Sequence, residues 1–259
     1  MSVNFRTNVC RYTKLRLPAL VAPHELKIKR TSAADSIADI LRAGITSGGM
    51  PPRERLIEAD LAERLSVSRT PLREALQQLE SEGFVQRLPA GGLVVADLDP
   101  NDLEDLLWLR AVLESELSRE VARTATPSAV AELARILDQM ETVSQHPDLF
   151  VGFGRNFHDE LAAMFGNERC RAVLRQVRHH VDRYWAVTTA RQPDRPGQSS
   201  CEHREILAAI RDHDEVAAGT RMRDHIMAEA EVCLDTVRAL RGRSSVAAAT
   251  PHPTGEVAG

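Results

Sequence analysis

The stretch VSRTPLREALQQLESEG, residues 67–83, decides the fold of this 259-residue chain. Leu72, Leu76 and Leu79 recur at spacings of four and three residues, which predicts a helix with one apolar face. Ala75 would lie beside that face. The stretch therefore predicts a helix that packs one side against a core.

Both ends of this helix carry their own signals. Ser68 or Thr70 can cap the start, because a short hydroxyl side chain accepts a hydrogen bond from a free backbone N–H. Pro71 suits the first turn, where its missing N–H costs no hydrogen bond. Gly83 marks the end, since glycine readily takes the left-handed conformation that closes a helix.

A shorter helix is predicted just before it. Residues 58–65, EADLAERL, form this helix, and the Ser66-Val67 link is a tight turn. Arg69 and Arg73 are four residues apart, so both guanidinium groups project from one side of the second helix. Two short helices, a tight turn and a basic start to the second helix predict a helix-turn-helix, whose second helix enters the major groove of DNA.

Residues 84–95, FVQRLPAGGLVV, predict a hairpin, because two short β-prone runs surround a Pro/Gly turn. Such a hairpin after a helix-turn-helix is a wing, and its glycines let the backbone approach a sugar-phosphate edge. The alternative is a small helical core with an added hairpin and ordinary solvated arginines. The order of cap, apolar face, arginine pair and wing favours DNA binding. The expected DNA-binding residues are Ser68, Arg69, Thr70, Pro71, Arg73, Arg87, Gly91 and Gly92.

These residues resemble the winged-helix domain of the GntR family of bacterial regulators. The similarity runs through Arg55-Leu56 and residues 61–65, 67–76 and 79–83. It implies a sequence-specific DNA-binding domain. Two positions depart from the family pattern. Arg53 stands where the usual Pro-Gly turn has glycine, which suggests a different turn, and Ala59 replaces a base-reading arginine of many members, which suggests an altered operator.

Charge is unevenly distributed along the chain. Residues 1–95 hold 14 Lys/Arg against 10 Asp/Glu, whereas residues 96–259 hold 19 against 27. A positive N-terminal part fits contact with phosphates, and an acidic C-terminal part does not. The asymmetry predicts two domains with separate roles.

The cysteines and the hydropathy indicate the compartment. Cys10, Cys170, Cys201 and Cys233 are scattered and form no CxxC pair. No signal peptide is visible, and no run of 18 apolar residues could span a membrane. We therefore expect a cytoplasmic protein, associated with the bacterial nucleoid when bound to DNA, with no membrane partner.

Four segments are expected. Residues 1–30 are basic and lack periodicity, which predicts a disordered leader; a DNA-embracing arm and a misassigned start codon are the alternatives. Residues 31–96 form the winged helix-turn-helix domain, residues 97–241 a helical domain, and residues 242–259 a small, polar, disordered tail. The apolar face of the first helix is expected to comprise Ile37, Ile40, Leu41 and Ile45.

Only helices are predicted beyond Asp99-Pro100. They span about 99–124, 126–146, 148–166, 168–189, 200–211 and 214–240, with a loop over 192–198. Antiparallel helices joined by short loops make a bundle. The expected fold class is mainly α, with an N-terminal winged helix-turn-helix domain followed by an all-α antiparallel six-helix bundle.

The bundle resembles the FCD effector domain of the FadR-like subgroup of the GntR family. The matching residues include Leu109-Arg110, Leu113-Glu114, Phe157-His158, Gly166-Asn167, Glu202-His203 and His225-Ile226. The resemblance implies that residues 97–241 bind an effector and mediate dimerisation.

Three histidines on separate predicted helices carry the most specific chemistry. His158, His203 and His225 can converge inside a bundle, and imidazole is a common ligand of transition metals. In metal-binding FCD domains the resemblance implies an aspartate four residues before the first histidine, and here that position is Gly154. The expected cofactor is one divalent ion per subunit, Zn²⁺, Ni²⁺ or Mn²⁺, in a site lacking one ligand. The other histidines show no partner pattern.

Three interpretations of this cluster remain open. Water or an effector carboxylate can complete a three-histidine metal site, because open sites commonly have three protein ligands. The histidines can instead serve as hydrogen-bond donors in a metal-free pocket. They can also be ordinary core or surface histidines.

Arg110 is the expected anion-binding residue of the bundle. Its guanidinium matches a carboxylate bidentately, and the resemblance places the equivalent arginine in the effector cavity of several family members. The alternative is a surface arginine paired with Glu114 one turn later. Trp185 and Ser199 are further effector-binding candidates, because they flank the loop beside the histidine-bearing helices.

The sequence favours a DNA-binding regulator over two other classes. A metal-dependent helical enzyme lacks support, since no Glu-x-x-His pair, nucleophile elbow or phosphate-binding glycine loop occurs. A ligand-independent DNA-binding protein would not need the bundle. We expect a homodimeric repressor, not an enzyme, that binds a palindromic operator in double-stranded DNA and responds to a small organic acid.

Overall fold

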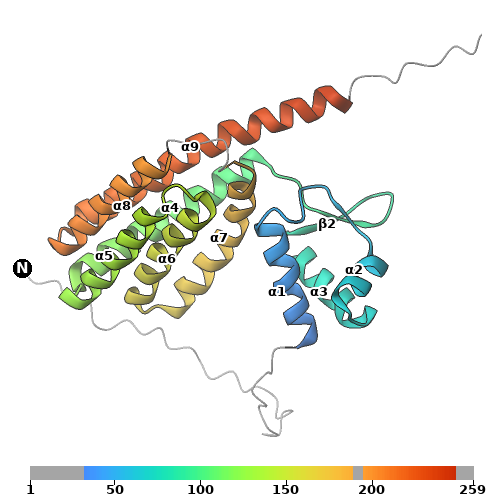
Figure 1. Ribbon diagram of the computed structural model, residues 1–259, viewed down its shortest axis with the longest axis horizontal. Helices are drawn as coiled ribbons and strands as arrows, with labels where there is room; N and C mark the ends of the chain where they lie inside the picture. The colour runs from blue at the N-terminus through green and yellow to red at the C-terminus, as the bar shows by residue number, and fades with distance from the viewer. Residues whose placement is uncertain (1–31, 189–194, 249–259) are drawn as a thin grey trace, which may run out of the picture.

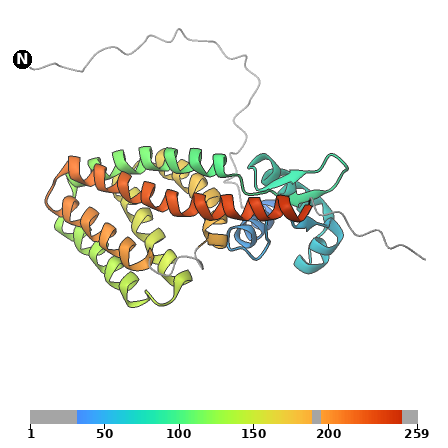
Figure 2. The same ribbon diagram turned by 90° about the horizontal axis from the view of Figure 1, so that it is seen from above.

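A computed structural model of the protein describes residues 32–188 and 195–248. Figure 1 shows a winged-helix part beside a helical bundle, and Figure 2 shows the long last helix extending along the bundle toward the winged-helix side. The expected leader and most of the expected tail lie outside the described residues. Within them, no helix is long and apolar enough to cross a membrane.

The winged-helix part combines helices with a small antiparallel sheet in the order β1-β3-β2. Its elements are α1 (Ala33–Thr46), β1 (Arg55–Leu56), α2 (Glu58–Leu65), α3 (Arg69–Ser81), β2 (Val85–Arg87) and β3 (Leu93–Val95). The predicted helix-turn-helix is confirmed as α2 and α3, and the predicted hairpin as β2 and β3. Strand β1 was not predicted, because two residues are too few to show an alternating pattern.

Helix α3 has the predicted apolar face. Leu72, Leu76 and Leu79 are at most 1% exposed. Ser68 occupies the N-cap position, but its side chain makes no capping hydrogen bond. Thr70 lies inside the helix, so its expected capping role is wrong. Gly83 follows the helix with φ 83°, as a glycine stop requires.

Two details of the winged-helix part differ from expectation. Ile40 is 56% exposed, because Ala34, Ile37, Ala38, Leu41 and Ile45 provide the buried face of α1. Arg53 has φ 68°, the left-handed region that favours glycine. The arginine therefore adopts a conformation suited to the glycine it replaces, and its backbone N–H donates to Val95 O at 2.9 Å. A different turn is not needed.

The bundle consists of six antiparallel helices, as predicted, over the described residues. They are α4 (Pro100–Thr124), α5 (Pro127–Thr142), α6 (Pro147–Phe165), α7 (Glu168–Thr188), α8 (Arg195–Arg211) and α9 (Glu215–Ala248). Asp99 and Thr126 cap α4 and α5 through their side chains. Gly166 ends α6 with φ 72°.

Two helix ends were predicted wrongly. Helix α8 begins at Arg195, so residues 195–198 are helical and not loop, because Pro196 and Gly197 are tolerated in a first turn. Helix α9 continues to Ala248, so the expected tail from residue 242 is wrong as far as 248. Its last turns are rich in Ala, Ser and Arg, which obscured the apolar pattern.

Helix α7 is the helix of the bundle that lies against the winged-helix part (Figure 1). Arg183 on this helix donates to three carbonyl oxygens of the winged-helix part and the linker, Gly83 O at 3.4 Å, Ala96 O at 2.5 Å and Asp97 O at 3.2 Å. His180 stacks on Phe84 with ring centroids 4.3 Å apart, and the Arg183 guanidinium lies over the same ring. We call His180, Arg183 and Phe84 the α7 seam.

Candidate functional site

The start of α3 is open to solvent. Ser68, Arg69 and Thr70 are exposed, and Pro71 is partly exposed. Among the described residues, no carboxylate forms an ion pair with Arg69, whereas Arg73 Nε donates to Glu58 Oε2 at 2.7 Å. Unpaired N–H groups and a basic side chain make this helix start suited to the negative edge of DNA.

The wing tip is built for close approach of its backbone. Gly91 and Gly92 have φ 88° and 92°, and Leu88 N donates to Gly92 O at 3.0 Å to close the turn. A Cβ at either glycine would meet nothing within 4 Å, so conformation and not space requires glycine. Arg87 is exposed and pairs with Glu80 of α3 at 2.8 Å.

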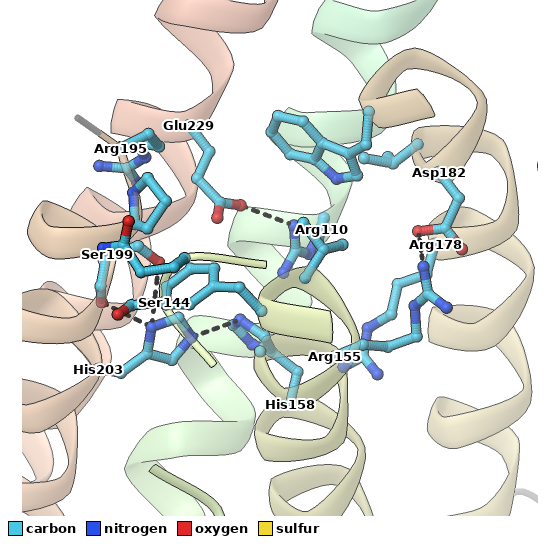
Figure 3. A pocket seen from close by; sticks show the side chains of 17 residues that line it. Arg110, Ser144, Arg155, His158, Arg178, Asp182, Arg195, Ser199, His203 and Glu229 are labelled. Atoms are coloured by element: carbon cyan, nitrogen blue, oxygen red, sulfur yellow. Dashed lines mark hydrogen bonds and ion pairs between the residues drawn. The ribbon is translucent and has the colours of Figure 1, made fainter. Parts of the chain in front are cut away.

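The three histidines meet inside the bundle. His158 of α6, His203 of α8 and His225 of α9 are at most 3% exposed, and each offers a ring nitrogen within 4.8 Å of the other two. The Nε2 atoms of His158 and His203 lie 3.3 Å apart (Figure 3). Two nitrogens bound tetrahedrally to one zinc ion at about 2.0–2.1 Å are separated by about 3.3–3.4 Å.

Each ring is oriented by a partner on its other nitrogen. The Nδ1 atoms contact Glu114 Oε2 at 2.5 Å, Ser199 O at 2.7 Å and Glu202 Oε2 at 2.6 Å, for His158, His203 and His225 respectively. All three partners are acceptors, so each Nδ1–H donates to its partner and Nε2 is the ring nitrogen left for a metal ion. Such partners are typical of histidines that bind metal.

Burial favours the neutral form of two of these imidazoles, His158 and His203. It lowers the pKa of His158 to about 4, although Glu114 opposes the shift. Burial, together with His225 and His158 as neighbours, holds the pKa of His203 well below its usual value. Lone pairs that converge without a proton between them repel one another unless a cation lies among them. The arrangement therefore fits a divalent metal ion.

Gly154 lies close to this cluster but supplies no ligand. It lines the same cavity as His158 and His203, and a Cβ there would meet only the Met140 sulfur, at 3.8 Å. The wall of the cavity is therefore open where the family's aspartate would project.

A cavity of about 350 Å³ adjoins the histidines (Figure 3). Arg110, Trp185 and Ser199, the three expected effector-binding residues, all line it. Its charged lining also includes residues that the sequence analysis did not single out, namely Arg155, Arg178, Asp182, Arg195 and Glu229. No motif marked them, because they come from four helices and converge only when the bundle forms.

Arg110 is buried and already has two carboxylate partners. Its Nε donates to Glu114 at 2.8 Å and its Nη1 to Glu229 at 3.1 Å. The pairing with Glu114 is thus present, but on the inside of the bundle and not on its surface. Burial would raise the pKa of Glu114, yet Arg178, His158 and Arg110 outweigh it and hold this pKa well below its usual value.

Two other arginines that line the cavity also pair with carboxylates, Arg178 with Glu114 and Asp159 and Arg195 with Glu202, but each keeps one N–H group without a partner. Arg178 Nη2 and Arg195 Nε are buried and make no hydrogen bond. Unsatisfied donors of buried charged groups are costly, and an anion in the cavity would remove that cost.

A winged helix joined to a helical bundle with a polar, histidine-lined cavity is the architecture of a DNA-binding regulator with a second, helical domain. The chain matches the family model for bacterial regulatory proteins of the gntR family over residues 33–95 and that for the FCD domain over residues 105–228. It is 34% identical over 168 residues to the Nta operon transcriptional regulator of Aminobacter aminovorans, covering 64% of this chain and 79% of that protein. The protein belongs to the GntR family and is a transcriptional regulator, not an enzyme.

Other similarities agree with this assignment. An uncharacterised HTH-type regulator from an unstable DNA locus of Streptomyces ambofaciens is 29% identical, covering 83% of this chain and 89% of that protein. The structure of E. coli McbR/YncC shares the fold, with a TM-score of 0.69 at 20% identity over 80% of this chain and 99% of its own. A putative GntR regulator from Rhodococcus sp. RHA1 has a TM-score of 0.67 at 25% identity, over 78% and 97% of the two chains.

Proposed function

We propose that the protein is a homodimeric repressor that leaves a palindromic operator when a small organic acid binds in the bundle. The observation that carries this proposal is the cavity itself. It combines three imidazoles with two unsatisfied arginine donors, and α7 connects its wall to the winged-helix part.

Dimerisation supports specific DNA binding. One recognition helix buries little surface, and two-fold symmetry doubles its contacts on a palindrome. Ser68, Arg69, Thr70, Pro71 and Arg73 at the start of α3 would face the major groove, and Arg87, Gly91 and Gly92 of the wing would face the backbone. Glu58 and Glu80 would release their arginines to DNA.

A divalent ion held by His158, His203 and His225 would give the acid its first contact. Nitrogen ligands favour Zn²⁺ or Ni²⁺ over Mn²⁺. The ion would supply an open coordination position for a carboxylate. Glu114, Ser199 and Glu202 fix the orientation of the three imidazoles through hydrogen bonds to Nδ1.

Arg178 and Arg195 would give the acid its second contact. Their unsatisfied N–H groups come from α7 and α8, on two sides of the cavity (Figure 3). Trp185 and Ser199 would complete the lining. Arg110 is the less favourable anchor. All three arginines form ion pairs with carboxylates, but only Arg178 and Arg195 each keep a buried N–H group without a partner.

Operator binding in the presence of organic acids tests the proposal. The operator is first selected from random duplex DNA, and its affinity is then measured by fluorescence anisotropy with a panel of mono-, di- and tricarboxylic acids and sugar acids. At least one acid should weaken binding tenfold or more. The Arg178→Gln and Arg195→Gln variants should bind the operator normally, but the acid should weaken their binding less than it weakens that of the parent. Arg204 forms its ion pairs on the outside of α8, so the Arg204→Gln variant should respond to the acid like the parent.

Each part of the proposal can fail separately. If no DNA sequence is enriched, operator recognition is wrong. If the operator binds but none of the acids changes its affinity twofold in metal-loaded protein, the carboxylate effector is wrong. If sedimentation shows that one protein molecule, and not two, binds each operator, the homodimer is wrong.

A further inference from the structure

The carboxylate of Glu229 lies beside the histidine cluster, in contact with His225. Glu229 follows His225 by four residues on α9, so both side chains project from one face of that helix. Its Oε1 lies 3.6 Å from His225 Nε2, close to the separation of two ligands on one ion. Its other oxygen, Oε2, accepts a hydrogen bond from Arg110 at 3.1 Å.

The contact leaves a buried ring nitrogen of His225 without a hydrogen-bond partner. His225 Nδ1 donates a hydrogen bond to Glu202 Oε2, whereas its Nε2 is buried with no hydrogen-bond partner. Glu229 Oε1 and His225 Nε2 therefore face each other in the bundle interior without a hydrogen bond, and a cation between them would satisfy both atoms. Glu229 is only 17% exposed, so little water screens the two atoms.

From these contacts we propose that Glu229 is the fourth protein ligand of the metal site, together with His158, His203 and His225. The inference rests on the proposed function in one respect, that the three histidines hold an ion. Glu229 would bind the ion through Oε1 while Arg110 keeps Oε2, as a hydrogen bond from a neighbouring donor orients a ligating carboxylate. Arg110 is then a positioning residue of the metal site.

The ligand set also changes where the effector enters. In the family pattern the acidic ligand comes from α6, at the position of Gly154, whereas here it would come from α9. The open wall at Gly154 would leave that side of the ion to the acid. Arg155 and Arg178, which line the cavity, would then lie on the side from which the acid approaches.

Metal affinity and metal geometry test the assignment on the full chain. Affinities for Zn²⁺ and Ni²⁺ are measured by competition with a chromogenic chelator, and the ligand set is followed in the visible spectrum of the Co²⁺-loaded protein. Glu229→Gln should lose at least tenfold in affinity and change the Co²⁺ bands. Glu231→Gln, an exposed neighbour on α9, should match the parent in both. Adding Gly154→Asp to Glu229→Gln should restore the affinity.

Different outcomes identify which statement is wrong. If Glu229→Gln binds both ions within twofold of the parent and keeps its Co²⁺ spectrum, Glu229 is not a ligand. If the parent binds neither ion, the metal site itself is wrong. The operator and acid titrations then still test whether the protein binds DNA and whether an acid regulates that binding. Should Glu229→Gln fail to fold, Glu229→Asp retains the charge but shortens the reach, and an unchanged affinity there would equally overturn the proposal.

Discussion

Arg69 and Arg73 of α3, which the sequence predicts to have the same role, differ in their surroundings. Arg73 is 61% exposed and pairs with Glu58, while Arg69 lies at the first helical position with no carboxylate partner among the described residues. DNA would have to displace Glu58 to use Arg73, whereas Arg69 is available at once. We therefore expect Arg69 to contribute more to operator binding.

Arg69→Ala should lower operator affinity and leave the fold intact. A base contact by arginine contributes about 1–3 kcal/mol, so the affinity should fall by about 5- to 150-fold at constant salt. Anisotropy titration measures the affinity, and circular dichroism checks the fold. Arg135→Ala, on the outside of α5, is the matched control and should bind normally. A folded Arg69→Ala protein with the affinity of the parent would exclude Arg69 from the interface.

His180 makes stability depend on pH. Burial, with Arg183 nearby, lowers the pKa of this histidine below its usual value. The unfolded chain takes up a proton near pH 6.5, at a higher pH than the folded protein does, so stability falls as the pH drops below about 6.5. His180→Phe keeps a ring stacked on Phe84 and removes the titration. Urea unfolding at pH 7.5 and 5.5 should show a smaller acid-induced loss for the variant; equal losses would contradict the prediction.

At the scale of elements, α7 separates two sets of contacts. Arg178, Asp182 and Trp185 line the cavity, and His180 and Arg183 contact the winged-helix part and the linker. At 3.6 residues per turn these two sets fall on roughly opposite faces of the helix. The helix is thus a direct physical connection between the cavity and the DNA-binding part.

Arg183→Ala should weaken that connection. Hydrogen bonds from a charged donor contribute about 1.5–3 kcal/mol each at most, so we expect a loss of about 1–3 kcal/mol in stability. The operator affinity should respond less to the acid than in the parent. Arg175 is exposed and lies about two turns before Arg183 on α7, so Arg175→Ala controls for the loss of a charge. Thermal unfolding and the acid titration measure both effects, and an unchanged acid response would show that α7 does not link the two parts.

Most elements could be predicted from the sequence, because their signals are local. The leucine spacing of α3, the Asp99-Pro100 and Thr126-Pro127 starts and the glycine stops are all read within a few residues. The errors arose where tertiary contacts override local pattern. Strand β1 exists only because β3 pairs with it, and the start of α8 contains Pro and Gly yet is helical, with Arg195 paired to Glu202.

At the scale of the whole molecule, the metal ion would join three helices of the bundle. His158, His203 and His225 come from α6, α8 and α9, so binding stabilises the folded state relative to the unfolded chain. An ion at 100 times its dissociation constant should add about 2.7 kcal/mol. Differential scanning calorimetry with Zn²⁺ or Ni²⁺ should show a higher Tm that a chelator reverses, and His203→Asn should abolish the shift. No shift with either ion would favour a metal-free pocket.

The cavity was only partly predictable. The three histidines and Arg110 were found through resemblance to the FCD domain, and the structure brings them together. Glu114, Arg178, Arg195 and Glu229 were missed as site residues, because a charged residue on an amphipathic helix is usually solvated. Only the packing of α4, α7, α8 and α9 turns these charges inward, and no local spacing encodes that packing.

The α7 seam would be sensitive to small rotations of α7. Side chains of a helix extend about 5–6 Å from its axis, so a rotation of α7 by only about 10° moves their ends by about 1 Å. Such a movement away from the carbonyl oxygens would break the two longer Arg183 hydrogen bonds, at 3.2 and 3.4 Å, and weaken the one at 2.5 Å. A ligand that displaces Arg178 or Asp182 slightly would therefore be felt at Gly83 and Ala96 without any large hinge motion.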